Sequence, residues 1–160
     1  MASNQWLDPV SRRFEDFSVG DYVKTRGRTV DIGDFTIFSG LTGDHYPLHT
    51  DHEYAAGTQF GARIAHGPLT FALAVGLVGM TGFYGDAVMA LLGIDGLRAK
   101  APVFAGDTIH VVATVIETNK NASGRTGSIK LGYSVRNQRD EEVMYFEQNN
   151  LARCREENNE

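Results

Sequence analysis

One segment of the sequence restricts the fold more than any other, the apolar stretch from Gly67 to Met80. It has the length of a helix, and Pro68 suits a first helical turn, where the missing N–H costs nothing. Large apolar side chains would then cover every face, through Leu69, Phe71, Leu73, Val75, Leu77, Val78 and Met80. A helix that is apolar all round must be buried on all sides. The rest of the chain, or a partner, therefore has to surround it.

Glycines interrupt this predicted helix at Gly76 and Gly79, and Gly82 lies near its end. A glycine in a helix interior costs about 1 kcal/mol relative to alanine. We therefore expect a closely packed neighbour at Gly76 and Gly79.

The second half of the sequence has the patterns of β-strands. Strands are predicted at Gly96–Val103, Ile109–Thr118, Ser128–Arg136 and Val143–Asn149, with hairpin turns at Asn121–Gly124 and Asn137–Asp140. A buried helix followed by antiparallel strands indicates an α+β fold whose sheet curls around the helix. Such a sheet covers only part of the helix. We therefore expect a second subunit, in a homodimer or a higher homo-oligomer, to complete the burial.

The first half of the sequence has shorter elements. Tyr22–Val30 is a strand candidate, and Asp34 is a candidate N-cap for a short helix that runs through Phe38. After a polar stretch, Glu53–Ala56 has the length of one helical turn, which Asp51 is placed to cap.

Length and charge limit the class of protein. The 160 residues fit one domain, which we place at 14–154, between an N-terminal arm (1–13) and a polar tail (155–160). The formal net charge is −5 and the cations are scattered, which argues against nucleic acid as a partner. The single cysteine, Cys154, and the lack of an apolar signal segment favour a cytoplasmic protein. The longest apolar stretch is too short to cross a membrane.

Polar residues concentrate in GDHYPLHTDHEY, from Gly43 to Tyr54. A metal site of His45, His49 and His52 would need one helix face, and Pro47 inside the segment disfavours that geometry. Taken singly, His45, His52 and Asp51 fit residues that cap turns in a surface loop.

The same segment also fits an acid–base pair. Asp44 and His49 lie five residues apart with a Tyr-Pro bend between them, so both can converge on one point. Reference pKa values of about 3.9 and 6.5 leave the carboxylate ionised and the imidazole able to switch near neutrality. Such a pair can hold one water molecule, remove its proton and pass a proton onward.

Three motifs carry a family resemblance. The run from Phe38 to Ala55, FSGLTGDHYPLHTDHEYA, resembles the signature of the MaoC-like enoyl-CoA hydratases, the (R)-specific hydratase family. IAHG at Ile64–Gly67 is similar to the family's opening of the long helix, and PVFAGD at Pro102–Asp107 resembles its turn into a strand. The three matches occur in the family's order and span about two thirds of the chain.

The resemblance implies a hot-dog fold, a sheet wrapped around the central helix. It implies reversible hydration of a trans-2-enoyl-CoA to a 3-hydroxyacyl-CoA, with Asp44 and His49 holding the attacking water and supplying the α-carbon proton. The CoA thioester is then the substrate, and no cofactor or metal is implied. Rival functions are a hot-dog acyl-CoA thioesterase and a non-catalytic acyl-CoA-binding module.

Further residues receive candidate roles. The N–H of Gly67, at the start of the long helix, is suited to stabilise charge that develops on the thioester oxygen, and the resemblance points to the same glycine. The other substrate-binding candidates are Tyr46, His66, Thr70, Arg63, Arg98 and Lys100, the last three as cations for the phosphates of CoA. His66 also fits a core histidine or a residue that supports the loop. Tyr46 is a departure, because the family usually has asparagine there. Many members also have a helix serine, for which this chain offers only Thr70.

Overall fold

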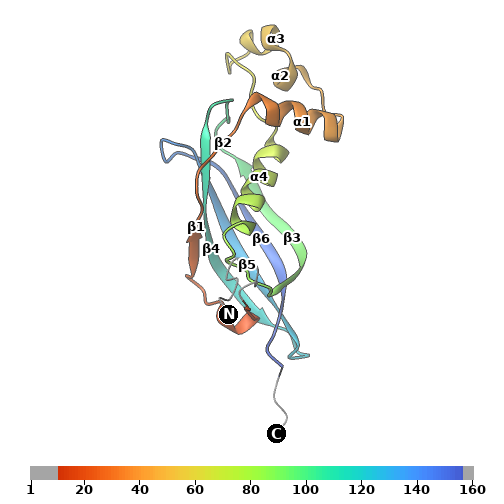
Figure 1. Ribbon diagram of the computed structural model, residues 1–160, viewed down its shortest axis with the longest axis vertical. Helices are drawn as coiled ribbons and strands as arrows, with labels where there is room; N and C mark the ends of the chain where they lie inside the picture. The colour runs from red at the N-terminus through yellow and green to blue at the C-terminus, as the bar shows by residue number, and fades with distance from the viewer. Residues whose placement is uncertain (1–10, 157–160) are drawn as a thin grey trace, which may run out of the picture.

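The computed structural model describes residues 11–156, which form a curved antiparallel sheet with one long helix in its concave face (Figure 1). The strands are β1 (Tyr22–Lys24), β2 (Arg28–Thr29), β3 (Val88–Ala99), β4 (Thr108–Lys120), β5 (Thr126–Arg136) and β6 (Glu142–Arg153). The helices are η1 (Phe14–Asp16), α1 (Ile32–Thr42), α2 (Pro47–Thr50), α3 (His52–Ala56) and α4 (Gly67–Gly79). The predicted α+β class, with a sheet around a central helix, is confirmed.

The sheet has the order β1-β4-β5-β6-β3, and β2 pairs separately with β4. The predicted turns between β4 and β5 and between β5 and β6 are confirmed, and both join antiparallel neighbours. Tyr133 of β5 lies opposite Phe146 of β6, and both are fully buried. The side chains that alternate toward α4 therefore make up the core.

Helix α4 lies where the sequence predicts it. The prediction that it is buried on all sides is wrong for the single chain. Leu69, Leu73 and Val78 are buried, whereas one strip is exposed, consisting of Pro68, Ala72, Gly76, Gly79 and Met80. The reason is that the sheet covers one side of the helix only. A Cβ added at Gly76 or Gly79 would meet no described atom within 4 Å, so the part of the chain that the structure describes does not supply the expected close neighbour.

Strand β3 differs most from its prediction, since it begins at Val88 rather than Gly96. Among residues 11–156 it pairs only with β6 and so forms an edge of the sheet, and Met89, Leu91, Leu92 and Leu97 are exposed. The start of this strand could not be predicted, because apolar side chains lie on both of its faces and polar and apolar residues do not alternate. Gly96, with a φ of +59°, lies where the pairing register shifts, so it marks a bulge inside the strand and not its start.

The first strand and first helix also need correction. Tyr22–Val30 is split into β1 and β2, because the chain turns aside at Thr25, whose Oγ1 accepts a hydrogen bond from the N–H of Val111 at 2.9 Å. Helix α1 is capped by Asp31, whose Oδ1 accepts from Ile32 N. Asp34 completes the capping box by accepting from Asp31 N at 2.9 Å.

The described parts of the terminal segments contact the domain. Arg13 of the predicted arm pairs with Asp86 at 2.8 Å, and Arg155 of the predicted tail pairs with Asp16. Residues 1–10 and 157–160, which make up the rest of both segments, lie outside the described residues. Between residues 11 and 156, no helix is long and apolar enough to cross a membrane.

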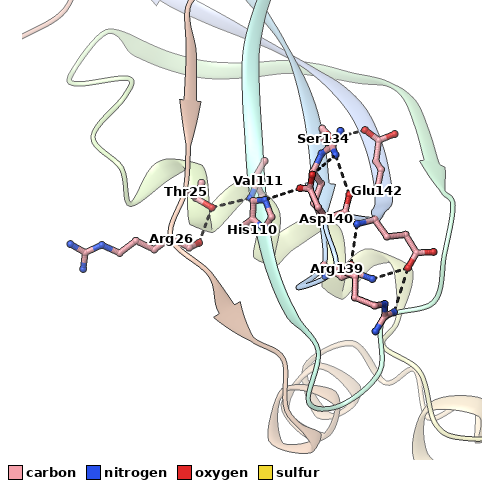
Figure 2. A network of polar contacts seen from close by, with 11 residues as sticks. Thr25, Arg26, His110, Val111, Ser134, Arg139, Asp140 and Glu142 are labelled. Atoms are coloured by element: carbon pink, nitrogen blue, oxygen red, sulfur yellow. Dashed lines mark hydrogen bonds and ion pairs between the residues drawn. The ribbon is translucent and has the colours of Figure 1, made fainter.

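A polar network ties the start of β4 to the β5–β6 turn (Figure 2). The imidazole of His110 faces the carboxylate of Asp140, with Nε2 and Oδ1 3.7 Å apart, which is too long for a hydrogen bond. Burial of the ring and the nearby cations Lys24 and Arg136 lower the pKa of His110 from its usual 6.5, although Asp140 opposes this.

We expect His110 to make the fold sensitive to acid. A histidine whose pKa is lower in the folded state than in the unfolded state takes up protons preferentially on unfolding. The free energy of unfolding should therefore fall as the pH drops below about 6.5. His110→Asn should reduce the difference between urea midpoints measured at pH 7.5 and pH 5.5. An equal difference in both proteins would show that other groups cause it.

Candidate active site

The polar segment is positioned by the ends of two helices. Helix α1 ends at Gly43, which takes a left-handed conformation (φ +77°) and donates from its N–H to Ser39 O at 2.8 Å. Asp44 follows directly. Pro47 then starts the short helix α2, which carries His49. Asp51 caps α3 by accepting from Tyr54 N at 3.0 Å, as predicted.

His49 is held in a defined orientation. Its Nδ1 lies 2.8 Å from the carbonyl oxygen of Ile64. Because a carbonyl only accepts hydrogen bonds, Nδ1 carries the proton of the neutral ring. Nε2 is then left as the acceptor, which is the form that a general base needs.

Asp44 is exposed, and its Oδ1 accepts from Tyr46 N at 3.2 Å, which fixes the carboxylate against its own loop. The carboxylate lies close to two imidazoles, since one potential ligand atom from each of Asp44, His49 and His66 lies within 4.8 Å of the others. A water molecule that bonds to two groups at about 2.8 Å fits between groups at that spacing.

His66 connects the two members of the predicted pair. It is almost fully buried, and its Nε2 lies 3.1 Å from the backbone carbonyl of Asp44, to which it donates. Its ring stacks on that of His49, with centroids 3.8 Å apart and planes at 28°. Its Nδ1 is buried with no hydrogen-bond partner in the described residues. His66 therefore belongs to the core and supports the loop that carries Asp44, which are the two roles that the sequence offered beside substrate binding.

Asp44, His49 and His66 are also the residues that could hold a metal ion. The set of His45, His49 and His52, weighed from the sequence, does not form such a group among residues 11–156. His45 and His52 are instead exposed in the loop.

A cavity of about 290 Å³ lies beside His49. Gly67 and Thr70, at the start of α4, and Lys100, just after β3, belong to its lining. The rest is mainly apolar and consists of Phe60, Ile64, Ala65, Ala99, Ala101, Pro102, Val103, Val143 and Met144. A cavity with one imidazole, a free helix start and apolar walls suits a small apolar group that carries a polar reacting centre.

Comparison with known proteins identifies the family of the chain. A family model described as "MaoC like domain" matches residues 16–138, which is more than half of the chain. The chain belongs to the MaoC-like family. Its fold is the hot-dog fold, as the resemblance implied.

Individual MaoC-like relatives cover most of the chain. An (R)-specific enoyl-CoA hydratase from Rhodospirillum rubrum is 34% identical over 108 residues, 68% of this chain and 72% of that protein. A solved structure described as monoamine oxidase regulatory protein from Archaeoglobus fulgius has a TM-score of 0.86 at 35% identity, covering 91% of this chain and 96% of that one. Protein MaoC from Klebsiella aerogenes is 37% identical over 108 residues, but this chain spans only 32% of its length.

In this MaoC-like chain the other predicted substrate residues lie apart from the cavity. Tyr46 is 54% exposed, bonds to the hydroxyl of Tyr54 at 3.3 Å and does not belong to the lining. Arg63 reaches Thr50 O at 3.5 Å, and Arg98 bonds to the neighbouring Leu97 O. Neither arginine belongs to the lining, so the cavity has Lys100 as its cation, and Lys100 pairs with Glu142.

Proposed function

We propose that this protein adds water reversibly across the double bond of a trans-2-enoyl-CoA and forms a 3-hydroxyacyl-CoA, with R stereochemistry. The observation that carries the proposal is that His49 lines one apolar cavity together with the start of α4, while the exposed carboxylate of Asp44, outside that lining, has an oxygen within 4.8 Å of a ring nitrogen of His49. Relatives named as an (R)-specific enoyl-CoA hydratase and a 3-hydroxybutyryl-CoA dehydratase support it.

Water would be held between Asp44 and His49. Asp44 offers its carboxylate oxygens as acceptors, and His49 offers Nε2, because its Nδ1 donates to Ile64 O. The water oxygen bonds to the β-carbon and one of its protons passes to the pair, which delivers a proton to the α-carbon. The pair thus ends in the protonation state in which it started, and one H₂O has been added.

Gly67 would stabilise the charge that moves onto the thioester oxygen. It is the first residue of α4, and first-turn N–H groups have no partner within their helix. The helix dipole adds a partial positive charge at the same point. Pre-arranged donors of this kind contribute about 3–4 kcal/mol to catalysis.

The decisive assay uses crotonyl-CoA and separates hydration from hydrolysis. A hydratase removes the enoyl absorbance without releasing free thiol, whereas a thioesterase releases thiol. We expect loss of absorbance alone. Thiol release without hydration would favour the thioesterase, and binding without any turnover would favour a non-catalytic module.

We propose short acyl chains as the preferred substrates, because about 290 Å³ is at the lower limit of ligand cavities. Met144 belongs to the lining and is almost fully buried. Met144→Ala should therefore raise the rate with an eight-carbon enoyl-CoA relative to crotonyl-CoA. Val19→Ala, which truncates an exposed apolar side chain outside this cavity, is the control. An unchanged ratio in Met144→Ala would place the acyl chain elsewhere.

We further propose a homodimer or a higher homo-oligomer. The exposed strip of α4 and the exposed leucines of edge strand β3 are surfaces that a second copy would cover. Light scattering should give a mass at least twice the 17.5 kDa of one chain, and a mass of one chain would contradict the proposal.

A further inference from the structure

A second cavity, of about 990 Å³, is rich in arginine and lies far from His49. Its lining comes from segments next to both described chain ends and from the β4–β5 turn. These segments lie toward the end of the molecule opposite α2 and α3 (Figure 1). Its basic lining residues are Arg13, Arg125, Arg153 and Arg155, and hydroxyls come from Ser11, Ser123 and Thr126. One acidic residue, Glu156, belongs to the lining.

The positive charge of this arginine cavity is only partly neutralised. Arg13 pairs with Asp86 and Arg155 pairs with Asp16, but neither acid lines the cavity. Arg125 and Arg153 form no ion pair with any residue from 11 to 156. A chain with a net charge of −5 thus concentrates four of its arginines around one space. Planar guanidinium groups and hydroxyls are the donors that phosphate oxygens prefer.

We propose that the arginine cavity binds the phosphate groups of a nucleotide, and that this nucleotide is the phosphorylated ADP portion of a CoA thioester whose acyl group occupies the partner copy's active site. A free nucleotide has the same chemistry and is the alternative source. The first part of the proposal stands on the cavity alone, and the link to CoA rests on the proposed function.

Strand β3 supplies the geometric link. Met89, near its start, lines the arginine cavity, and Ala99, at its end, lines the cavity beside His49. Ten residues of strand separate them by roughly 33 Å within one chain. Antiparallel pairing of β3 with the same strand of a second copy, centred on its middle, places Met89 of one chain beside Ala99 of the other. Each arginine cavity then adjoins the active site of the other copy.

The binding test uses adenosine 3′,5′-bisphosphate and calorimetry on the full chain. We expect the double variant Arg125→Gln/Arg153→Gln to weaken binding at least tenfold. The control Arg26→Gln/Arg139→Gln removes two exposed arginines outside the cavity and should bind like the wild type. Absence of binding to the wild type, or equal loss in both double variants, overturns the site. This measurement needs no enzymatic activity, so it stands even if the hydratase proposal fails.

The kinetic test identifies the source of the phosphates. It compares crotonyl-CoA with crotonyl-pantetheine, which has the same reacting group but no nucleotide. If the arginines hold the CoA substrate, the KM advantage of the CoA thioester shrinks at least tenfold in Arg125→Gln/Arg153→Gln. If bisphosphate binding is lost but this advantage stays, the site takes a free nucleotide and the link to CoA is wrong. Thermal melts of all variants confirm that they fold.

Discussion

Asp44→Asn is expected to lower kcat for the hydration of crotonyl-CoA by at least ~10²-fold, the usual effect of losing an acid–base group. Asparagine has nearly the same size, and its side-chain oxygen can still accept from Tyr46 N. The loop should therefore keep its shape, while the amide cannot take a proton from water. Steady-state rates from the loss of enoyl absorbance, with melting temperatures of both proteins, measure the effect.

Asp51→Asn is the matched control. Asp51 lies in the same polar segment, and its carboxylate caps α3 rather than facing the imidazoles. Asparagine is an equally good helix cap, so the rate should stay within about twofold of wild type. A wild-type rate in Asp44→Asn, or an equal loss in both variants, would remove Asp44 from the proposed mechanism.

His49→Ala should show a loss similar to that of Asp44→Asn, because the two groups are proposed to act on one water molecule. Residues that act as a unit have non-additive effects. The variant that lacks both groups should therefore be about as slow as the slower single variant. Multiplied losses would instead indicate two independent roles.

The sequence predicted the elements whose patterns are local. The apolar run of α4 and the alternation in β5 were each enough to place an element, and Pro47 correctly argued against one helix face for three histidines. The motif around Asp44 and His49 predicted which side chains would come together. Their proximity in the structure agrees with it.

Contacts between distant segments could not be predicted. His66 joins Asp44 and His49 through a hydrogen bond and a ring stack that depend on how α4 docks against the loop. The apolar lining of the cavity comes from strand ends and loops that share no spacing in sequence. The exposed strip of α4 is a related case. The apolar composition of the helix predicts that this strip is buried, but it does not predict which surface packs against it.

Phe146→Ala is expected to cost about 3–5 kcal/mol in the free energy of unfolding, the range for truncating a buried aromatic ring. Phe146 is fully buried on β6 and stacks on Tyr133 of β5, with centroids 4.5 Å apart. It also meets Phe71 of α4 edge-on at 4.9 Å. The ring thus contacts both the sheet and α4. The cavity that Phe146→Ala leaves can close only if the helix moves relative to the sheet.

Such a loss is a large part of the 5–15 kcal/mol that stabilises an ordinary domain. At about 2–4 °C per kcal/mol for a chain of this size, the melting temperature should fall by roughly 6–20 °C in calorimetry. Tyr22→Ala, an exposed aromatic on β1, should change the free energy of unfolding by less than about 0.5 kcal/mol. Equal shifts in the two variants would mean that the contact between Phe146 and Phe71 does not hold the helix in the sheet. If the contact does hold it, Phe146→Ala should also lower the hydration rate before the chain unfolds, because α4 carries Gly67 into the site.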